Sequence, residues 1–138
     1  MTREQVFLVQ RSWRQVLPVA NTVAEMFYAR LFALDPAVRP LFKNEMREQR
    51  RKLMAVIGSV VSDLSRLERI VPAVQQLGRR HAGYGVRDGH YATVGAALLW
   101  ALERGLGEAF TPDVKAAWAS AYDLLAQTMQ DAAAQVAA

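Results

Sequence analysis

The residue best suited to chemistry in this sequence is His81, one of two histidines among 138 residues. It lies in the stretch Leu77-Gly-Arg-Arg-His81-Ala-Gly-Tyr84-Gly-Val86. Val74, Leu77 and His81 follow one another at helical spacing, which places the imidazole near the end of an apolar helical face. A histidine there is either a core side chain hydrogen-bonded to a backbone carbonyl or a metal ligand. The other polar residues must decide between these two roles.

The available ligands limit the kind of metal site that His81 could serve. The chain has no cysteine, which excludes thiolate sites and haem attached covalently through a C-x-x-C-H motif. Zinc or non-haem iron needs three or four protein ligands, and the inward helical faces carry no carboxylates to join two histidines. A non-covalent haem b needs only one axial ligand, because its porphyrin brings four nitrogens. His81 can be that ligand, and the Leu77 carbonyl one turn earlier would orient its second ring nitrogen.

Two further polar residues point toward the interior. Tyr28 lies beside the apolar stripe of its helix, and Gln49 lies one turn before Leu53 on the inner face of another helix. Each has an ordinary explanation, since Tyr28 could keep its hydroxyl at the surface and Gln49 could cap a neighbour or reach solvent. Across a haem from His81, a tyrosine hydroxyl would instead donate to bound dioxygen. Such a bond is worth about 1.5 to 3 kcal/mol and slows oxygen loss roughly 10- to 100-fold, with Gln49 holding the tyrosine.

A run of cations follows Gln49 closely. Arg47, Arg50, Arg51 and Lys52 stand near the start of a helix, where they oppose its macrodipole. Haem propionates would offset part of that cost. Lys52, close to Gln49, and Arg80, next to His81, are the best placed for them, whereas Arg47 and Arg51 fit a solvated face.

The elements that position these residues are helical almost throughout, so the expected fold class is all-α. A capping box formed by Thr2 and Gln5 predicts a first helix to about Leu17. The later helices are expected over 18–34, 36–42, a segment that follows Lys43 and Asn44 and ends before 63, then 72–81, 90–106 and from 112 onward. Residues 63–68 and 87–89 are expected to be connections, and Gly83 or Gly85 to be left-handed. The expected buried stripes are Val23, Phe27, Leu31 and Leu34; Leu53, Val56, Ile57, Val60, Val61 and Leu64; Val94, Leu98 and Leu102; and Trp118, Tyr122, Leu125 and Met129.

Length and composition predict one cytoplasmic domain over residues 1–138. Hydrophobic residues make up 52% of the chain, but no run reaches the roughly 18 to 20 apolar residues that span a membrane, and the N-terminus does not resemble a signal peptide. The formal net charge of +4 is compatible with anionic partners. Nucleic acid is not expected, because the aromatic residues do not alternate with the basic ones in a stacking pattern.

Several segments in order resemble the globin family over nearly the whole chain, from Val9 to about Met129. They are Phe27-Tyr28-Ala-Arg-Leu31-Phe32, Pro40-Leu41-Phe42, Gln49 with Leu53, Leu77-Gly-Arg-Arg-His81, Tyr84-Gly85-Val86, His90-Tyr91-Ala-Thr-Val94-Gly95 and Ala117-Trp118. The chain looks most like single-domain bacterial globins related to the globin domains of flavohaemoglobins, and closest to the Hell's Gate globin type. This resemblance implies a globin fold of seven to eight helices around one haem.

The resemblance also implies a role for each candidate residue. His81 would be the proximal iron ligand, and Tyr28 and Gln49 would form the distal pair. The remaining residues expected to contact the haem are Phe42, Lys52, Leu53, Leu77, Arg80, Tyr84, Val86, Tyr91, Val94 and Leu98. In one departure, Ala133 stands where flavohaemoglobins have a glutamate of the proximal network, which implies weaker peroxidase-like activation.

Two main functions remain open at this point. The first is high-affinity binding of dioxygen at ferrous haem, in which Tyr28 and Gln49 suppress oxygen loss. The second is dioxygenation of nitric oxide, for which a separate reductase would supply electrons, since the chain stops where flavohaemoglobins continue into flavin- and nicotinamide-binding domains. A gas sensor is a third alternative, although 138 residues leave no room for an output domain.

Overall fold

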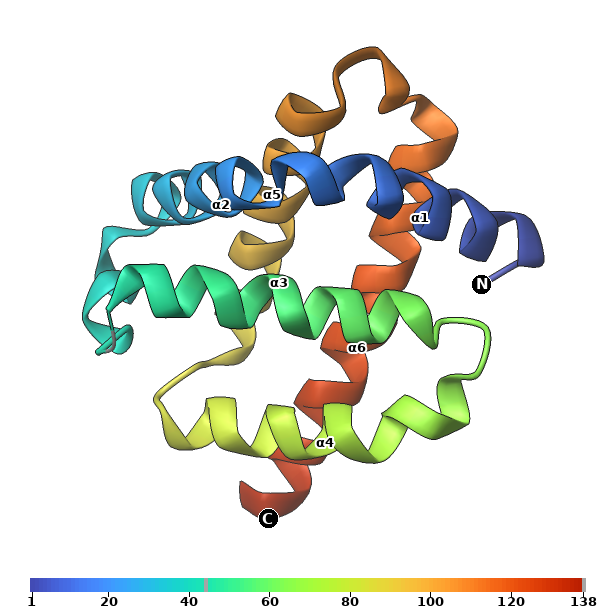
Figure 1. Ribbon diagram of the computed structural model, residues 1–138. Helices are drawn as coiled ribbons and strands as arrows, with labels where there is room; N and C mark the ends of the chain where they lie inside the picture. The colour runs from blue at the N-terminus through green and yellow to red at the C-terminus, as the bar shows by residue number, and fades with distance from the viewer. Residues whose placement is uncertain (44, 138) are drawn as a thin grey trace.

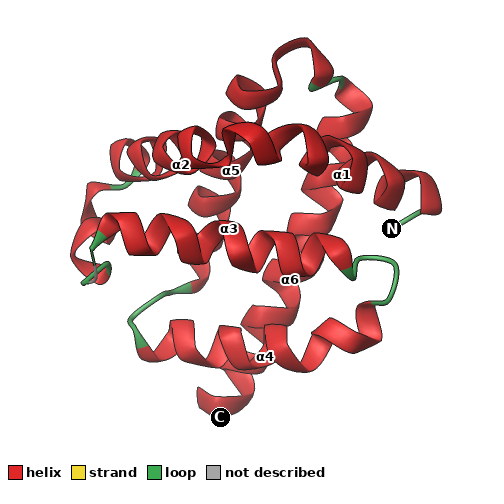
Figure 2. Ribbon diagram, viewed as in Figure 1, coloured by secondary structure: helices red, strands yellow, loops and turns green. Residues whose placement is uncertain are grey.

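The computed structural model describes residues 1–43 and 45–137 of the chain, with side chains described as far as Gln135. This part of the chain is helical, with short turns between the helices (Figure 2). The elements in order are α1 (Arg3–Val16), η1 (Leu17–Val19), α2 (Ala20–Leu34), η2 (Pro36–Leu41), α3 (Met46–Ser62), α4 (Leu67–Gly83), α5 (Asp88–Leu106), η3 (Gly107–Ala109) and α6 (Pro112–Ala137). The all-α class is confirmed. The described residues form six α-helices and three short 3-10 helices, somewhat different from the seven to eight helices expected.

Local side chains explain where several of these helices begin. The Thr2 hydroxyl accepts a hydrogen bond from the Gln5 backbone, and the Gln5 side chain accepts one in return, which confirms the capping box at α1. The Asp35 carboxylate accepts from the Ala37 backbone at the start of η2. Thr111 accepts from Val114 at the start of α6. In each case the side chain accepts a hydrogen bond from a backbone N–H group of the first helical turn, and this bond favours a helix start at that position.

The helices cross in layers, with α1, α2 and α3 in front of α5 and α6 in the view of Figure 1. The most extensive contacts join α4 to α6, α2 to α5 and α1 to α6. α3 packs on α1 and α2. Within the described residues, α3 and α4 are thus held mainly by other helices rather than by each other, and α4 lies below α3 in the view of Figure 1.

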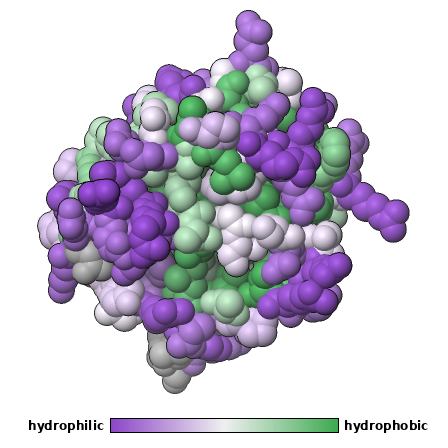
Figure 3. All heavy atoms as spheres, viewed as in Figure 1, coloured by the Kyte–Doolittle hydropathy of each residue, from purple (hydrophilic) through white to green (hydrophobic). Residues whose placement is uncertain are grey.

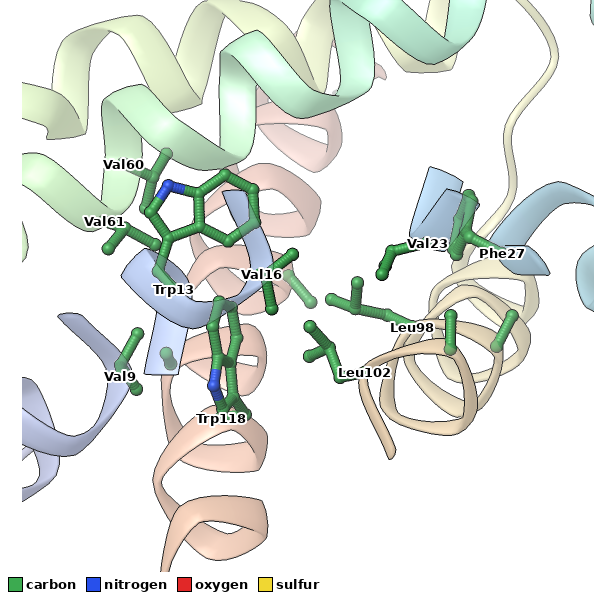
Figure 4. Packing of buried hydrophobic residues seen from close by; sticks show 14 of the residues in the cluster. Val9, Trp13, Val16, Val23, Phe27, Val60, Val61, Leu98, Leu102 and Trp118 are labelled. Carbon is green, nitrogen blue, oxygen red and sulfur yellow. The ribbon is translucent and has the colours of Figure 1, made fainter. Parts of the chain in front are cut away.

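One part of the core lies where α1, α5 and α6 meet. Trp13 and Trp118 lie with ring centroids 6.2 Å apart, and Val16 and Leu102 lie close to them (Figure 4). The Trp118 indole donates to the Ser12 hydroxyl at 2.8 Å, and that hydroxyl donates in turn to the Leu8 carbonyl. Burial of these groups is therefore compensated by hydrogen bonds.

Two expected core positions are wrong. Leu34 is 44% exposed because it is the last residue of α2, and Val56 is 41% exposed because α3 packs on its neighbours along one side only. None of the described helices is both long and apolar enough to cross a membrane.

Two helix starts also differ from the prediction. Pro72 lies inside α4, which begins five residues earlier at Leu67, so the helix tolerates the loss of one backbone donor near its start. Asp88 and Gly89 belong to α5 rather than to a separate turn. The Arg87 backbone donates to His90 Nδ1 at 2.9 Å, and this bond closes the first turn of α5.

Candidate functional site

The His81 imidazole is anchored by its own helix. Its Nδ1 lies 2.8 Å from the Leu77 carbonyl oxygen, as predicted from the four-residue spacing. A carbonyl can only accept, so Nδ1 carries the proton and the neutral ring keeps a free lone pair on Nε2. Burial lowers the pKa of His81, although the bond to Leu77 acts in the opposite direction. The neutral imidazole is the form that binds a metal.

The end of α4 is shaped by glycines on either side of His81. Gly78 lies so close to α6 that an added Cβ would overlap with the backbone of Met129. Gly85 has φ of +95°, which confirms the left-handed glycine expected after this helix. The Val86 backbone then donates to the His81 carbonyl at 3.0 Å. α4 is thereby held against α6, and it ends at Gly83, two residues after His81.

Tyr28 of α2 is a buried residue with 5% of its surface exposed. Its ring packs edge-on against Phe27 at 4.8 Å and against Phe42 at 5.4 Å. Its hydroxyl lies 3.5 Å from the main-chain carbonyl oxygen of Gln49. Burial raises the pKa of Tyr28, while its contact with Gln49 and the charge of Arg50 act in the opposite direction. The structure therefore brings together three predicted site residues: Tyr28 of α2, Phe42 directly after η2, and Gln49 of α3.

One polar residue of this region was not expected to point inward. Arg50 is half-buried, and its Nε is buried without a hydrogen-bond partner among the described residues. Arg50 lies three residues before Leu53 and seven before Ile57, which places it on the inner face of α3 by helical periodicity. In the sequence it was considered only as one cation of a basic run, and this spacing is the signal that could have found it.

The other predicted haem contacts fall into three groups by exposure. Tyr91 and Leu98 of α5 are buried, and the Tyr91 carbonyl accepts a hydrogen bond from the Tyr122 hydroxyl at 2.6 Å. Lys52, Arg80 and Tyr84 are exposed, with 64% of Tyr84 accessible and its ring 6.3 Å from the His81 ring. The half-buried apolar contacts are Leu53, Leu77, Val86 and Val94. All of these haem contacts remain predictions.

The residues present suit a haem in three ways. His81 offers a free Nε2, Arg50 keeps a buried cationic nitrogen that a negative group would satisfy, and apolar side chains of α3, α4 and α5 are only half-buried. Hydrophobic residues also reach the surface across the middle of the face shown in Figure 3, between hydrophilic residues on either side. Within the described part of the chain, no three His, Cys, Asp or Glu residues gather where they could hold a metal ion.

A family model described as Globin matches residues 25–129 of this chain. The chain belongs to the globin family. Its family and fold therefore agree with the expectation from the sequence, and globins are haem proteins that bind small gaseous ligands such as dioxygen. The matched range includes Tyr28, Gln49 and His81.

Similar proteins include bacterial and animal globins. The chain is 32% identical to the flavohemoprotein of Bacillus subtilis over 109 residues, which cover 77% of this globin and 27% of that protein. It therefore spans about a quarter of the length of that relative. It is also 31% identical to the neuroglobin of Danio rerio over 136 residues, covering 88% of this chain and 86% of neuroglobin.

Two solved structures are similar over almost their whole length. A bacterial globin from Campylobacter jejuni has a TM-score of 0.87 and 26% identity, covering 99% of both chains. An engineered carbene transferase, described as a candidate nitric oxide dioxygenase from Rhodothermus marinus, has a TM-score of 0.90 and 26% identity. That match covers 99% of this globin and 96% of the other chain.

Proposed function

We propose that this globin holds a non-covalent haem b through His81 and binds dioxygen with high affinity through Tyr28 and Gln49. His81 would hold the haem, whose iron would supply the binding site for a diatomic ligand, and Tyr28 and Gln49 would stabilise that ligand. The observation that carries the proposal is the buried Tyr28 hydroxyl, which has only a distant carbonyl as its acceptor.

The Tyr28 hydroxyl is suited to donate to a ligand. Its distance of 3.5 Å from the Gln49 carbonyl is long for an O–H···O bond, so the present contact is weak. Burial raises the pKa of Tyr28, which keeps the hydroxyl protonated at neutral pH. A bond from this proton to a partially negative ligand would be worth about 1.5 to 3 kcal/mol and would replace a poor hydrogen bond with a strong one.

Other residues of the chain would hold the cofactor. The bond from His81 Nδ1 to Leu77 fixes the ring so that Nε2 can serve as the axial ligand. Phe42, Leu53, Val86, Val94 and Leu98 would supply apolar contacts. The surface near the site carries three exposed residues, Lys52, Arg80 and Tyr84. The cations of Lys52 and Arg80 would pair with the haem propionates.

Dioxygenation of nitric oxide is a second candidate function. It is favoured by the similarity to a flavohemoprotein and to a candidate nitric oxide dioxygenase. In this reaction nitric oxide, dioxygen and one electron give one nitrate ion, and a reductase must supply the electron. Tyr28 and Gln49 would keep the dioxygen in place until nitric oxide arrives, so the same residues serve both functions.

The two functions can be separated by measuring nitric oxide consumption. The purified, haem-loaded and oxygenated protein would be given nitric oxide with NADH and a flavin reductase present. Many turnovers per protein, with nitrate as the product, identify the enzyme. Consumption of one equivalent followed by an inactive ferric protein identifies the oxygen binder. A His81→Gly variant should retain haem poorly, and added imidazole should restore a haem spectrum; normal haem retention without imidazole would contradict the role of His81.

A further inference from the structure

The positive charge of this protein is concentrated in two segments. Residues 43–52 and 79–88 contain eight of the 17 lysines and arginines but only three of the 13 acidic residues. Their net charge of +5 exceeds the +4 of the whole chain, so the remaining residues together carry a charge of −1. We call these two segments the basic surface; its cations are Lys43, Arg47, Arg50, Arg51, Lys52, Arg79, Arg80 and Arg87.

The two segments lie on the same side of the molecule. In Figure 1 the beginning of α3 and the end of α4 are at the left, and Figure 3 shows hydrophilic residues gathered on that side. An added Cβ at Gly85 would lie 3.5 Å from the Leu41 side chain, so the chain just before the first segment touches the second. Gln49 and His81 belong to these same segments, which places the basic surface at the edge of the proposed haem site.

Most of these cations are not used by the fold. Arg51 pairs with Glu48, and Arg79 donates to Gln76. Lys43, Arg47 and Arg87 are exposed, and within the described residues they have no ion pair. Arg47 is the second residue of α3, where a cation opposes the helix macrodipole and destabilises the helix slightly. A cluster of like charges in such positions lowers stability and needs a negative partner to offset it.

We propose that the basic surface docks an acidic protein that donates one electron to the site. This inference rests on the proposed haem binding. The two propionates of a haem would neutralise two of these cations at most, which leaves a net charge of +3 for a partner. An electron donor must approach the edge of the site, and opposite charges steer such encounters. Exposed Tyr84, between arginines, is of the type that anchors protein interfaces, whereas nucleic acid would favour a series of aromatic residues.

The proposed reaction transfers one electron, and no atom is transferred and no bond is formed or broken. The donor loses one electron, the ferric iron of the bound haem gains it, and the donor becomes oxidised by one equivalent. The side chains of the basic surface only bring the two proteins together and orient them. Docking can therefore be measured with an oxidised donor, in the absence of any reaction.

The test uses the haem-loaded protein and flavodoxin, a small acidic flavin protein, as the probe. A triple variant, Lys43→Glu, Arg47→Glu and Arg87→Glu, reverses three exposed charges of the basic surface without changing Lys52 or Arg80. The matched control, Arg3→Glu, Arg11→Glu and Lys115→Glu, makes the same change in net charge at exposed positions elsewhere. Calorimetry at low salt should show affinity for oxidised flavodoxin reduced at least tenfold in the first variant and less than twofold in the control.

Reduction by flavodoxin hydroquinone should follow the same pattern, and its rate should depend less on salt in the first variant. Equal losses in the two variants would show an effect of net charge alone and overturn the proposal. Unchanged flavodoxin binding in the first variant would also overturn the proposal. Binding to phosphatidylserine vesicles and to duplex DNA would be measured as well, and a loss of either in the first variant would not rescue the proposal if flavodoxin binding were unchanged. Failure of the proposed haem binding would appear separately, as a missing Soret band in every variant including the unmodified protein.

Discussion

A buried tyrosine hydroxyl normally finds a good hydrogen-bond partner, and Tyr28 has a poor one. At 3.5 Å from the Gln49 carbonyl, its proton gains little from the protein itself. A ligand that accepts this proton would replace a long hydrogen bond with a shorter and stronger one. The aromatic rings of Phe27 and Phe42 pack against Tyr28 and hold its ring in position in the absence of a ligand.

We expect Tyr28→Phe to raise the oxygen dissociation rate of the haem-loaded protein at least tenfold, because a charge-assisted hydrogen bond worth about 1.5 to 3 kcal/mol is lost. Stopped-flow displacement of dioxygen by carbon monoxide measures this rate. Tyr84→Phe is the control, since the hydroxyl of this exposed residue should change the rate less than twofold. A change under threefold for Tyr28→Phe would show that its hydroxyl does not touch the ligand.

The lowered pKa of His81 predicts how acid affects the haem-free protein. Because burial disfavours the charged ring, the unfolded chain binds a proton more readily than the folded chain in the pH range just below the ordinary value of about 6.5. The free energy of unfolding should therefore fall as the pH is lowered from 7 through this range, by at most about 1.4 kcal/mol per pH unit from this group. Denaturant titrations of the protein and of His81→Leu should diverge there. Parallel curves would contradict the prediction.

At the scale of elements, the position of α4 decides where His81 can lie. Gly78 is three residues before His81, and its missing side chain lets α4 touch the backbone of α6 at Met129. A backbone contact cannot move aside as a flexible side chain can, so this approach fixes the depth of α4. Gly95 of α5 similarly makes room for the Tyr122 ring, whose hydroxyl bonds the Tyr91 carbonyl.

We expect Gly78→Ala to lower the free energy of unfolding by about 1 to 3 kcal/mol, even though alanine favours helices, because overpacking outweighs the gain in propensity. The variant should also lose haem faster, since α4 carries His81. Thermal unfolding and haem transfer to an acceptor protein measure the two effects. Gly83→Ala is the matched control, because nothing lies within 4 Å of an added Cβ there. A Gly78→Ala variant more stable than the unmodified protein would contradict the prediction, because it would show that α4 and α6 move apart to accept the added methyl group with little loss of free energy.

At the scale of the whole molecule, a haem would join two helices that are otherwise held separately. α3 packs on α1 and α2, while α4 packs on α6. A ligand that binds only the folded state stabilises it by mass action, about 4 kcal/mol at a thousandfold excess over Kd. The proposed cofactor should therefore contribute to the structure as well as to ligand binding.

Removal of haem should lower the melting temperature by roughly 10 to 20 °C, on the basis of that stabilisation energy and the size of the chain. Hydrogen exchange should accelerate most in α3 and α4, and least where Trp13 and Trp118 hold α1 on α6. Calorimetry and mass spectrometry of the two forms measure both effects. An unchanged melting temperature, or uniform acceleration along the chain, would contradict this role of the cofactor.

Local interactions made much of this protein predictable from its sequence. The capping residues Thr2 and Thr111 act on backbone groups three residues away, so the helix starts beside them could be read directly. The bond between His81 and Leu77 spans one turn of a single helix, and Gly85 adopts the left-handed conformation suited to a residue without a side chain. The resemblance to globins added the expected order of the helices.

The tertiary structure decided what depends on residues distant in the chain. The partner of the Tyr28 hydroxyl lies on α3, and the contact that requires Gly78 lies on α6. The burial of the Arg50 Nε atom depends on how α3 packs on its neighbours. Helical periodicity predicts on which face of a helix a residue lies, but it does not predict whether another helix covers that face. Leu34 and Val56 were therefore expected to be buried, although both are exposed. Helix starts and the orientation of His81 follow from interactions within one or two turns of the chain, whereas the contacts between side chains of different helices depend on how those helices pack.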